Sequence, residues 1–322
     1  MVKTASNHDI AAVDLTAVVV AVTDEEPRVL VNRLPRGLHA LPSGPLEPDH
    51  RTLGAGLRAW VEQQTGTRLG YVEQLYTFGD SGRAEGGDRD RRHLSIGYLA
   101  LTREAGASLP AQAAWIDWYR YVPWEDWRRG RPVLLDQVQK LLGRWASAGA
   151  TRELKAARRL RVGLAFGCDG ASWSDERVLE RYELLYEAGL VPEAHRDGAA
   201  VWAKPEEVPA GADAMLSDHR RILATAIARL RGKIKYRPVV FELMPPGFTL
   251  LQLQRAVEAL SGMRLHKQNF RRLVEQQGLV EETGQIVTAT GGRPAREVRF
   301  RQEVVLERLA PGVRIPTTRE RD

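Results

Sequence analysis

Near the C-terminal end of the chain, apolar residues recur three and four positions apart, as they do along one face of a helix. This spacing predicts a first short helix that starts at Thr249 and that Gly262 ends. Thr249 and Gln252 are placed to cap each other's backbone amides, and Phe248 can pack on the helix as a hydrophobic staple. The apolar face of this helix consists of Leu250, Leu253, Val257 and Leu260.

A second helix is predicted over about residues 266–277, where Phe270, Leu273 and Val274 share one face. Two helices around a glycine-bearing turn are typical of a helix-turn-helix, whose second helix enters the major groove of DNA. Its opposite face has the cations and amides that suit phosphates and base edges. These candidate DNA-binding residues are Lys267, Gln268, Asn269, Arg271 and Arg272.

Two short strands, 279–280 and 298–300, are predicted after the helices, with a loop over 281–296 that contains Gly291-Gly292-Arg293-Pro294. A glycine-rich hairpin with arginines beside a recognition helix is typical of the wing of a winged helix. Arg293 and Arg296 therefore join the candidate DNA-binding residues. The alternative is a small helical domain whose charged faces are only solvated, because charged faces alone are weak signals.

The N-terminal half combines β-branched apolar runs with one amphipathic helix, which indicates an α/β (α+β) domain. Residues 15–22 and 28–32 predict a strand hairpin, and residues 71–78 and 94–101 predict two further strands. A helix over 53–66 follows a turn-rich loop at 40–45. A charged loop spans residues 79–93.

The middle of the chain is mainly helical. Residues 134–145, 152–160 and 174–190 predict helices, residues 199–203 predict a strand of the N-terminal sheet, and residues 217–231 predict a connecting helix. Trp and Tyr residues crowd the stretch 115–127. We expect them to pack a domain junction or a dimer interface rather than a ligand, because buried aromatic rings mostly supply hydrophobic area.

These patterns divide the chain into an N-terminal domain (1–150), a helical segment that completes it (151–216), and a connecting helix with the winged helix-turn-helix (217–310). A tail, 311–322, is expected to be disordered. From residue 217 onward the chain holds 20 basic and 11 acidic residues, whereas the first 216 hold 27 and 30. The basic surplus thus lies with the helix-turn-helix, as expected of a DNA-binding domain.

Composition also narrows the class of protein. No apolar run among the 322 residues is long enough to span a membrane, so no membrane partner is expected. The single cysteine, Cys168, excludes an internal disulfide and a cysteine zinc cluster. A cytoplasmic protein is the simplest interpretation.

Several motifs carry a resemblance to a known family. Leu41-Pro42-Ser43-Gly44 and Glu62-Gln63-Gln64-Thr65-Gly66 resemble the motifs of a Nudix domain, and residues 72–80 with Arg83 resemble the hallmark of Nudix-related transcriptional regulators of NAD metabolism. Asn269-Phe270-Arg271-Arg272-Leu273 and Gly292-Arg293-Pro294-Ala295 resemble the winged helix of that NrtR and NadQ type, and the NadQ-like branch is the most similar. The resemblance implies a degenerate Nudix-like α/β/α sandwich, a helical segment and a C-terminal winged helix-turn-helix.

The chain departs from the pattern of Nudix hydrolases. These enzymes hold divalent metal with paired glutamates, because carboxylate oxygens are hard ligands for Mg²⁺. Anchored on Gly66, the pair falls on Gln63 and Gln64; anchored on Arg58, it falls on Glu62 and Gln63, with Ala59 at the preceding glutamate. Neither alignment leaves a complete carboxylate set. We therefore predict no catalytic residue, no metal site and no hydrolysis, but retained nucleotide binding.

The predicted ligand contacts are Arg33, Phe78, Arg83 and Arg91. Guanidinium groups suit a diphosphate, and Phe78 or its neighbour Tyr76 could stack on adenine. The alternatives are a solvated loop around Arg83 and Arg91 and a core role for the aromatic rings. The resemblance implies NAD, ADP-ribose or ATP as the effector, with no cofactor required.

Three functional hypotheses follow. The first is a ligand-responsive repressor that binds double-stranded DNA as a homodimer on a palindromic operator near genes of NAD synthesis or salvage, as the resemblance implies. The second is a Nudix pyrophosphohydrolase with altered metal ligands and an appended nucleic-acid-binding domain. The third is a constitutive DNA-binding or scaffolding protein whose Nudix part is only a dimerisation platform.

Overall fold

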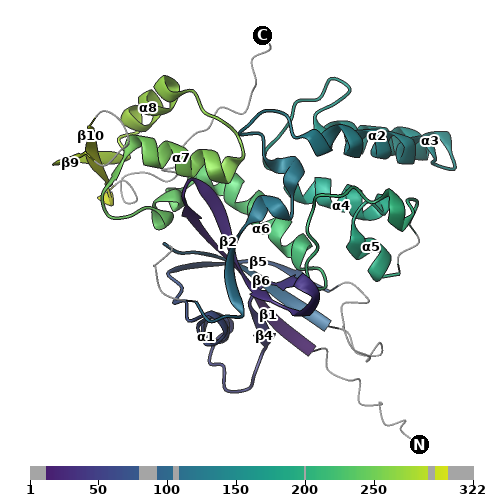
Figure 1. Cartoon of the computed structure of the whole chain (residues 1–322), viewed down its shortest axis with the longest axis horizontal. Helices are drawn as coiled ribbons and strands as arrows, with labels where there is room; N and C mark the ends of the chain where they lie inside the picture. The colour runs from purple at the N-terminus through teal and green to yellow at the C-terminus, as the bar shows by residue number, and fades with distance from the viewer. Residues whose placement is uncertain (1–11, 80–92, 104–108, 199–200, 289–293, 304–322) are drawn as a thin grey trace, which may run out of the picture.

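A computed structural model describes residues 12–79, 93–103, 109–198, 201–288 and 294–303. Figure 1 shows a sheet domain in the lower half, a layer of helices at the upper right and a small winged-helix domain at the upper left. One helix, α6 (His219–Tyr236), runs between the sheet and the helical layer and leads toward the winged helix. The predicted tail, 311–322, lies outside the described residues.

The N-terminal sheet is mixed. Its long central strand β1 (Ala12–Thr23) pairs antiparallel with β2 (Glu26–Arg33) and parallel with β6 (His93–Leu101), and β6 pairs antiparallel with β5 (Tyr71–Phe78). Short strands β3 (His39–Ala40) and β4 (Ser43–Pro45) pair with β2 and β1. The predicted hairpin and the strands at 71–78 and 94–101 are confirmed.

Alternation along β1 assigns its side chains to two cores. Leu15, Ala17 and Val19 pack under α1 (Leu53–Thr65) on one face. Val18 and Val20 belong to the larger core on the other face, which α6 covers. The predicted α/β/α arrangement is therefore confirmed. The larger core continues without a break into the helical layer and the winged helix, and the division at residues 150 and 216 stays a prediction.

The helical layer consists of α2 (Val133–Ser147), α3 (Arg152–Phe166), α4 (Val178–Ala188) and the short α5 (Pro192–Arg196). The helix predicted at 174–190 begins later, at Val178, and the helices predicted to end at residues 160 and 231 continue to Phe166 and Tyr236. The strand predicted at 199–203 is wrong over residues 201–203, which form no strand. The strand that joins β2 is instead β7 (Ala113–Asp117).

The winged helix contains β8 (Phe248–Thr249), α7 (Leu250–Ser261), α8 (Lys267–Gln276), β9 (Val280–Val287) and β10 (Ala295–Phe300). The helix-turn-helix is confirmed. The loop predicted over 281–296 is wrong at both ends, because β9 and β10 extend into it and pair antiparallel. Among the described residues, none of the helices combines the length and the apolar character needed to cross a bilayer.

Candidate nucleic-acid interface and nucleotide cleft

The start of α7 is fixed by the predicted capping box. The Gln252 amide N–H donates to Thr249 Oγ1 at 3.2 Å, and the Thr249 N–H donates to Gln252 Oε1 at 2.7 Å. Two amides that the helix leaves unsatisfied are thereby paired. At the other end, Gly262 adopts φ 74°, which ends the helix in the left-handed conformation that favours glycine.

The helix α8 presents a polar face to solvent. Phe270 and Val274 are buried, whereas Lys267, Gln268, Asn269, Arg271 and Arg272 are all exposed. Within the part of the chain that the structure describes, these five side chains form no hydrogen bond or ion pair. They can therefore contact DNA without breaking an interaction of the fold.

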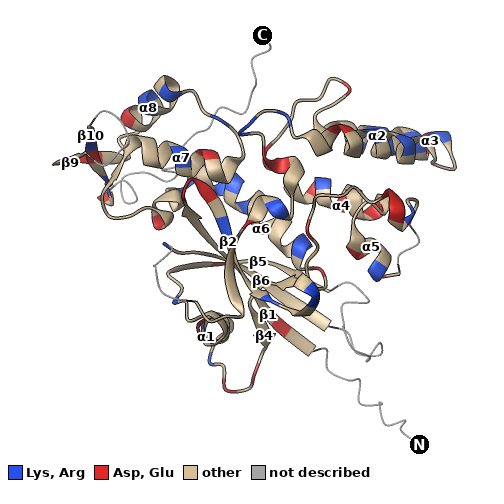
Figure 2. Ribbon diagram, in the orientation of Figure 1, with Lys and Arg blue, Asp and Glu red and all other residues tan. Residues whose placement is uncertain are grey.

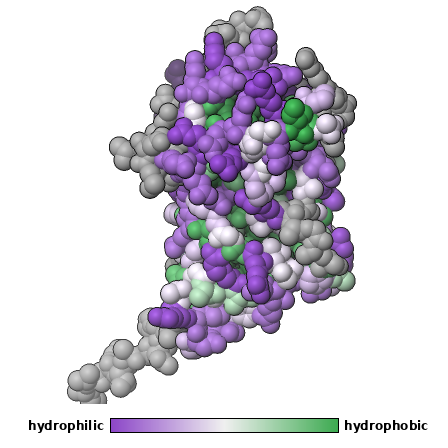
Figure 3. Space-filling view, turned by 90° about the vertical axis from the view of Figure 1, so that its left-hand side faces the viewer, coloured by the Kyte–Doolittle hydropathy of each residue, from purple (hydrophilic) through white to green (hydrophobic). Residues whose placement is uncertain are grey.

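The surface around α8 is hydrophilic. Figure 3 turns the winged-helix side toward the viewer, and the described surface of its upper part is mostly hydrophilic, with scattered apolar patches. Figure 2 places basic residues on α8; several of those along α6, such as Arg220 and Arg231, are buried and do not belong to this surface. Over its described residues, this surface lacks the large apolar area of a protein–protein interface. Polar surfaces with basic residues are instead typical of contacts with DNA.

The arginines of the wing have acidic partners. Arg296 Nη1 lies 2.6 Å from Glu282 Oε1, and Arg299 Nε lies 2.6 Å from Glu281 Oε1; all four side chains are well exposed. Hydrogen bonding to Glu282 raises the pKa of Arg296, so its charge is held but partly neutralised. Arg293 and the glycines Gly291 and Gly292 lie outside the described residues.

In the N-terminal domain, the side-chain amide of Gln64, near the C-terminal end of α1, forms hydrogen bonds with the loop at 41–45. Gln64 Oε1 accepts from Asn32 Nδ2 at 2.8 Å and from the Ser43 N–H at 3.2 Å, and Gln64 Nε2 donates to the Ser43 carbonyl at 2.7 Å. Glu62 instead pairs with the exposed Arg68 at 2.9 Å. Gln64, one of the two positions at which the expected glutamate pair falls, is therefore held by hydrogen bonds to the fold and carries no charge.

One group of possible metal ligands occurs among the described residues. Glu47, Asp49 and His50 bring their ligand atoms within 4.8 Å of one another just before α1. A turn explains this cluster, because the Glu47 N–H donates to His50 Nδ1 at 3.1 Å. Both carboxylates are exposed to solvent.

The predicted ligand contacts are only partly described. Arg33 is exposed at the end of β2, whereas Phe78 is 7% exposed and packs in the larger core. The Phe78 ring meets Tyr76 edge to face at 5.6 Å, and Tyr76 is 66% exposed. Tyr76 is thus the ring of this pair that is open to a planar ligand. Arg83 and Arg91 lie outside the described residues.

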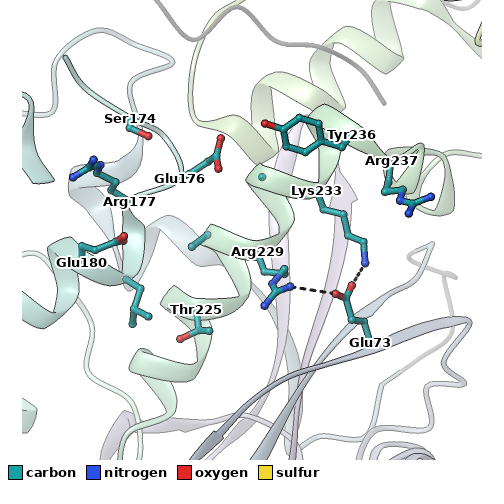
Figure 4. Close-up of a pocket in the computed structure, with 13 residues that line it drawn as sticks. Glu73, Ser174, Glu176, Arg177, Glu180, Thr225, Arg229, Lys233, Tyr236 and Arg237 are labelled. Carbon is teal, nitrogen blue, oxygen red and sulfur yellow. Dashed lines mark hydrogen bonds and ion pairs between the residues drawn. The ribbon is translucent and has the colours of Figure 1, made fainter. Parts of the chain in front are cut away.

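A groove of about 790 Å³ that the sequence did not suggest runs along α6 (Figure 4). Thr225, Arg229 and Lys233 of α6 line it, with Glu73 of β5 and Arg177 at the start of α4. Burial alone would raise the pKa of Glu73, but hydrogen bonds from Lys233 and Tyr71 outweigh burial and lower it. The same contacts raise the pKa of Lys233 against its own burial. The pair ties α6 to the edge of the sheet.

Comparisons with known proteins agree with this geometry. Residues 240–300 match the family model described as the NrtR DNA-binding winged helix domain. The ADPR responsive transcriptional repressor NtrR of Acinetobacter baylyi is 46% identical over 83 residues, which cover 26% of this chain and 33% of that repressor. The match therefore spans about a third of the length of that relative.

Two solved structures share the fold. NrtR of Shewanella oneidensis, in a crystal structure complexed with a 27mer DNA, has a TM-score of 0.52 at 20% identity over 91% of this chain and 95% of that chain. A MutT/nudix family protein from Enterococcus faecalis has a TM-score of 0.52 at 13% identity over 93% and 90% of the two chains. Identities this low establish the fold alone. With the matched winged helix, they confirm the resemblance to Nudix-related regulators of the NrtR type.

Proposed function

We propose that this chain is a ligand-responsive transcriptional repressor that binds operator DNA through α8 and the wing. The observation that carries the proposal is the exposed polar face of α8, in a domain that matches the NrtR winged helix over residues 240–300. Lys267, Arg271 and Arg272 would contact phosphates or guanines, and Gln268 and Asn269 would contact adenines. Arg293 and Arg296 of the wing would contact the DNA backbone.

The operator is proposed to be palindromic and the protein to be a homodimer. One helix-turn-helix contacts one half-site, so high affinity requires two copies on half-sites about one helical turn, ~10 bp, apart or a multiple of it. The resemblance to NrtR and NadQ regulators supports operators near genes of NAD synthesis or salvage. The protein would act in the cytoplasm, where that DNA lies.

The Nudix domain is proposed to sense an adenine-containing metabolite. Among NAD, ADP-ribose and ATP we favour ADP-ribose, because the Acinetobacter baylyi relative is named as a repressor responsive to it. Arg33, with Arg83 and Arg91, would hold the diphosphate, and Tyr76, rather than the buried Phe78 first predicted, would contact the base. No cofactor is required for this role.

The domain is proposed to bind its ligand without hydrolysing it. Gln64 occupies the position that faces the loop at 41–45, and both atoms of its amide are already hydrogen bonded. An amide oxygen also cannot offset the charge of Mg²⁺ or act as a base. This arrangement favours the regulator over the pyrophosphohydrolase hypothesis.

Selection of binding sequences from a random duplex library would test the proposal. The recovered duplex is then titrated by fluorescence anisotropy at fixed salt, with and without ADP-ribose, NAD or ATP. We expect a palindromic sequence, a stoichiometry of two chains per duplex and release of the DNA by ADP-ribose. Enrichment of no sequence would overturn DNA recognition, and indifference to all three nucleotides would favour the constitutive DNA-binding hypothesis.

A further inference from the structure

The aromatic stretch 115–127 lies at the junction between the Nudix sheet and the winged helix. Trp118, Tyr119, Tyr121 and Trp124 are all less than 5% exposed. Of the two predicted roles, the rings fill a junction inside the chain. Several of its polar groups reach the same short stretch of the winged helix, residues 259–264.

Three hydrogen bonds connect the aromatic stretch and its neighbour Arg128 to residues 259–264, the end of α7 and the turn before α8. Tyr119 Oη donates to the Ala259 carbonyl at 2.7 Å, and the Trp127 N–H donates to the Gly262 carbonyl at 2.7 Å. Arg264 Nε donates to the Arg128 carbonyl at 3.2 Å. The approach is so close that a Cβ on Gly262 would collide with the Glu125 carbonyl. The turn that aims α8 is therefore held from outside its own domain.

A buried ion network reinforces this contact. Glu125, with a fully buried side chain, accepts two hydrogen bonds from Arg181 of α4, at 2.5 and 2.8 Å, and one from Arg231 of α6 at 2.7 Å. Arg231 Nε then donates to the Leu260 carbonyl at 3.0 Å. Removing Glu125 would leave two buried guanidinium groups without their shared carboxylate, so this residue ties α4 and α6 together beside the end of α7.

Tyr119 completes the same network as a neutral donor. Burial raises the pKa of Tyr119 to about 12, although Arg231 and Arg128 lower it. Arg231 Nη2 donates a hydrogen bond to the Tyr119 hydroxyl at 3.2 Å, and the hydroxyl in turn donates one to the Ala259 carbonyl. The hydroxyl thus joins the ion network to the end of α7, and Tyr119→Phe removes this single oxygen atom while keeping the ring.

The other end of the aromatic stretch leads toward Arg33, one of the proposed ligand contacts. It continues from β7, which pairs with β2 from Arg28–Asp117 to Asn32–Ala113. The Arg33 N–H donates to the Gln112 carbonyl at 2.6 Å, and Asn32 contacts Gln64 of α1. Backbone pairs join β2 to β7, the chain continues through residues 118–126, and the Trp127–Gly262 hydrogen bond then reaches the turn before α8.

We propose that Tyr119, Glu125 and Arg231 are positioning residues for DNA recognition, and that the path from β2 through β7 carries the ligand state to α8. This inference rests on the proposed function. A shift of the end of β2 on ligand binding moves β7, and the clamp transmits the shift to residues 259–264. The connecting helix α6 is then one of two routes between the domains.

A pair of matched substitutions tests the proposal. Tyr119→Phe removes the hydroxyl that reaches α7, and Tyr121→Phe removes a hydroxyl in the same buried stretch that contacts His39 Nδ1 at 2.8 Å instead. Tyr119→Phe loses the hydrogen bonds to Ala259 and from Arg231, whereas Tyr121→Phe loses one part-buried hydrogen bond, so the free energy of unfolding is measured for both variants and the binding data are compared where both are fully folded. Operator affinity with and without ADP-ribose is measured by anisotropy, and ADP-ribose affinity of the DNA-free protein by calorimetry.

We expect Tyr119→Phe to weaken operator binding about fivefold and to reduce the effect of ADP-ribose on it by a similar factor. ADP-ribose affinity without DNA should stay within about twofold of the wild type, and Tyr121→Phe should behave as the wild type throughout. Equal behaviour of the two variants would overturn the proposal.

Amide hydrogen exchange of the wild-type chain gives a second test that needs no variant. Added ADP-ribose should change exchange in residues 113–127 and in 259–266 together. A change in α6 and in 259–266 without one in 113–127 would overturn the path through β7. A wild-type chain that binds no DNA would instead overturn the proposed function itself.

Discussion

The exposed side chains of α8 give the sharpest test at the scale of single residues. Arg272→Ala should lower operator affinity by about 1–3 kcal/mol if a base contact is lost, and should leave the free energy of unfolding unchanged. Gln276→Ala, on the exposed last turn of the same helix, is the matched control. Affinity is measured by fluorescence anisotropy at fixed salt. Unchanged operator affinity in both Arg272→Ala and Asn269→Ala would rule out α8 as the recognition helix.

The wing offers a change that should strengthen binding. Arg296 is 76% exposed and pairs with Glu282, an exposed ion pair of small net value to stability. Glu282→Gln should free this arginine for phosphate, raise affinity for non-specific DNA and steepen the slope of log Kd against log salt by about one. Glu206→Gln, an equal change of net charge in the helical layer, controls for long-range effects. Equal slopes in the two variants would show that Arg296 does not contact DNA.

A third residue-scale prediction concerns hydrolysis. With Mg²⁺ or Mn²⁺, the purified protein should turn over ADP-ribose no faster than a blank, because Gln64 replaces a carboxylate and is fully hydrogen bonded. Phosphate or AMP release over hours is the measurement. Glu62→Gln separates the sources of any residual signal: activity that persists through further purification but is lost in this variant belongs to the site and contradicts the prediction, whereas activity that survives the substitution comes from a contaminant.

Single residues also show which features of the candidate site could be predicted from the sequence and which could not. Helical spacing correctly predicted which side chains of α8 are exposed, because the period of the helix fixes its faces. It could not predict that Arg296 meets Glu282, since that pairing depends on a register that shifts between Arg296 and Val298. Nor could it tell which of Phe78 and Tyr76 is buried, because the Phe78 ring packs beside Gly97 of β6, in a core assembled from residues distant in sequence.

At the scale of elements, the capping box of α7 should contribute measurably to stability. Thr249 is 3% exposed and its cap is reciprocated by Gln252, so Thr249→Ala should lower the free energy of unfolding by about 1 kcal/mol. Thr52 caps α1 from an exposed position, through Ala55 N–H. Thr52→Ala should cost less in the same urea titration, and a larger loss there would contradict the argument.

Elements with such local signals were predicted, and elements defined by distant partners were not. The capping residue and the final glycine set the ends of α7 and α1 from local sequence alone. The strand β7 has only Trp115 and Ile116 as strong strand formers, and it exists because it pairs with β2 far earlier in the chain. Residues 201–203 show the reverse case, in which a strand-like composition finds no partner strand.

At the scale of the whole molecule, the fold class and the order of its parts could be predicted, but the junction between them could not. The contact between Tyr119 and Ala259 joins residues 140 positions apart, and no local pattern encodes it. The aromatic crowding at 115–127 indicated a buried surface without indicating its partner. The structure adds the second connection between the sheet and the winged helix, and with it a physical basis for communication.

Communication between two sites must be reciprocal, and this gives the last prediction. If ADP-ribose releases the operator, it binds the DNA-free arrangement more tightly, and saturating operator must weaken ADP-ribose binding by the same factor. A typical coupling of about 1–3 kcal/mol corresponds to a factor of about five to 150. Both affinities are measured on the full chain, with the operator titrated at fixed ADP-ribose and ADP-ribose titrated at saturating operator. Equal ADP-ribose affinity with and without operator would contradict the sensor, however tightly each ligand binds alone, because a ligand with no preference between two states shifts neither.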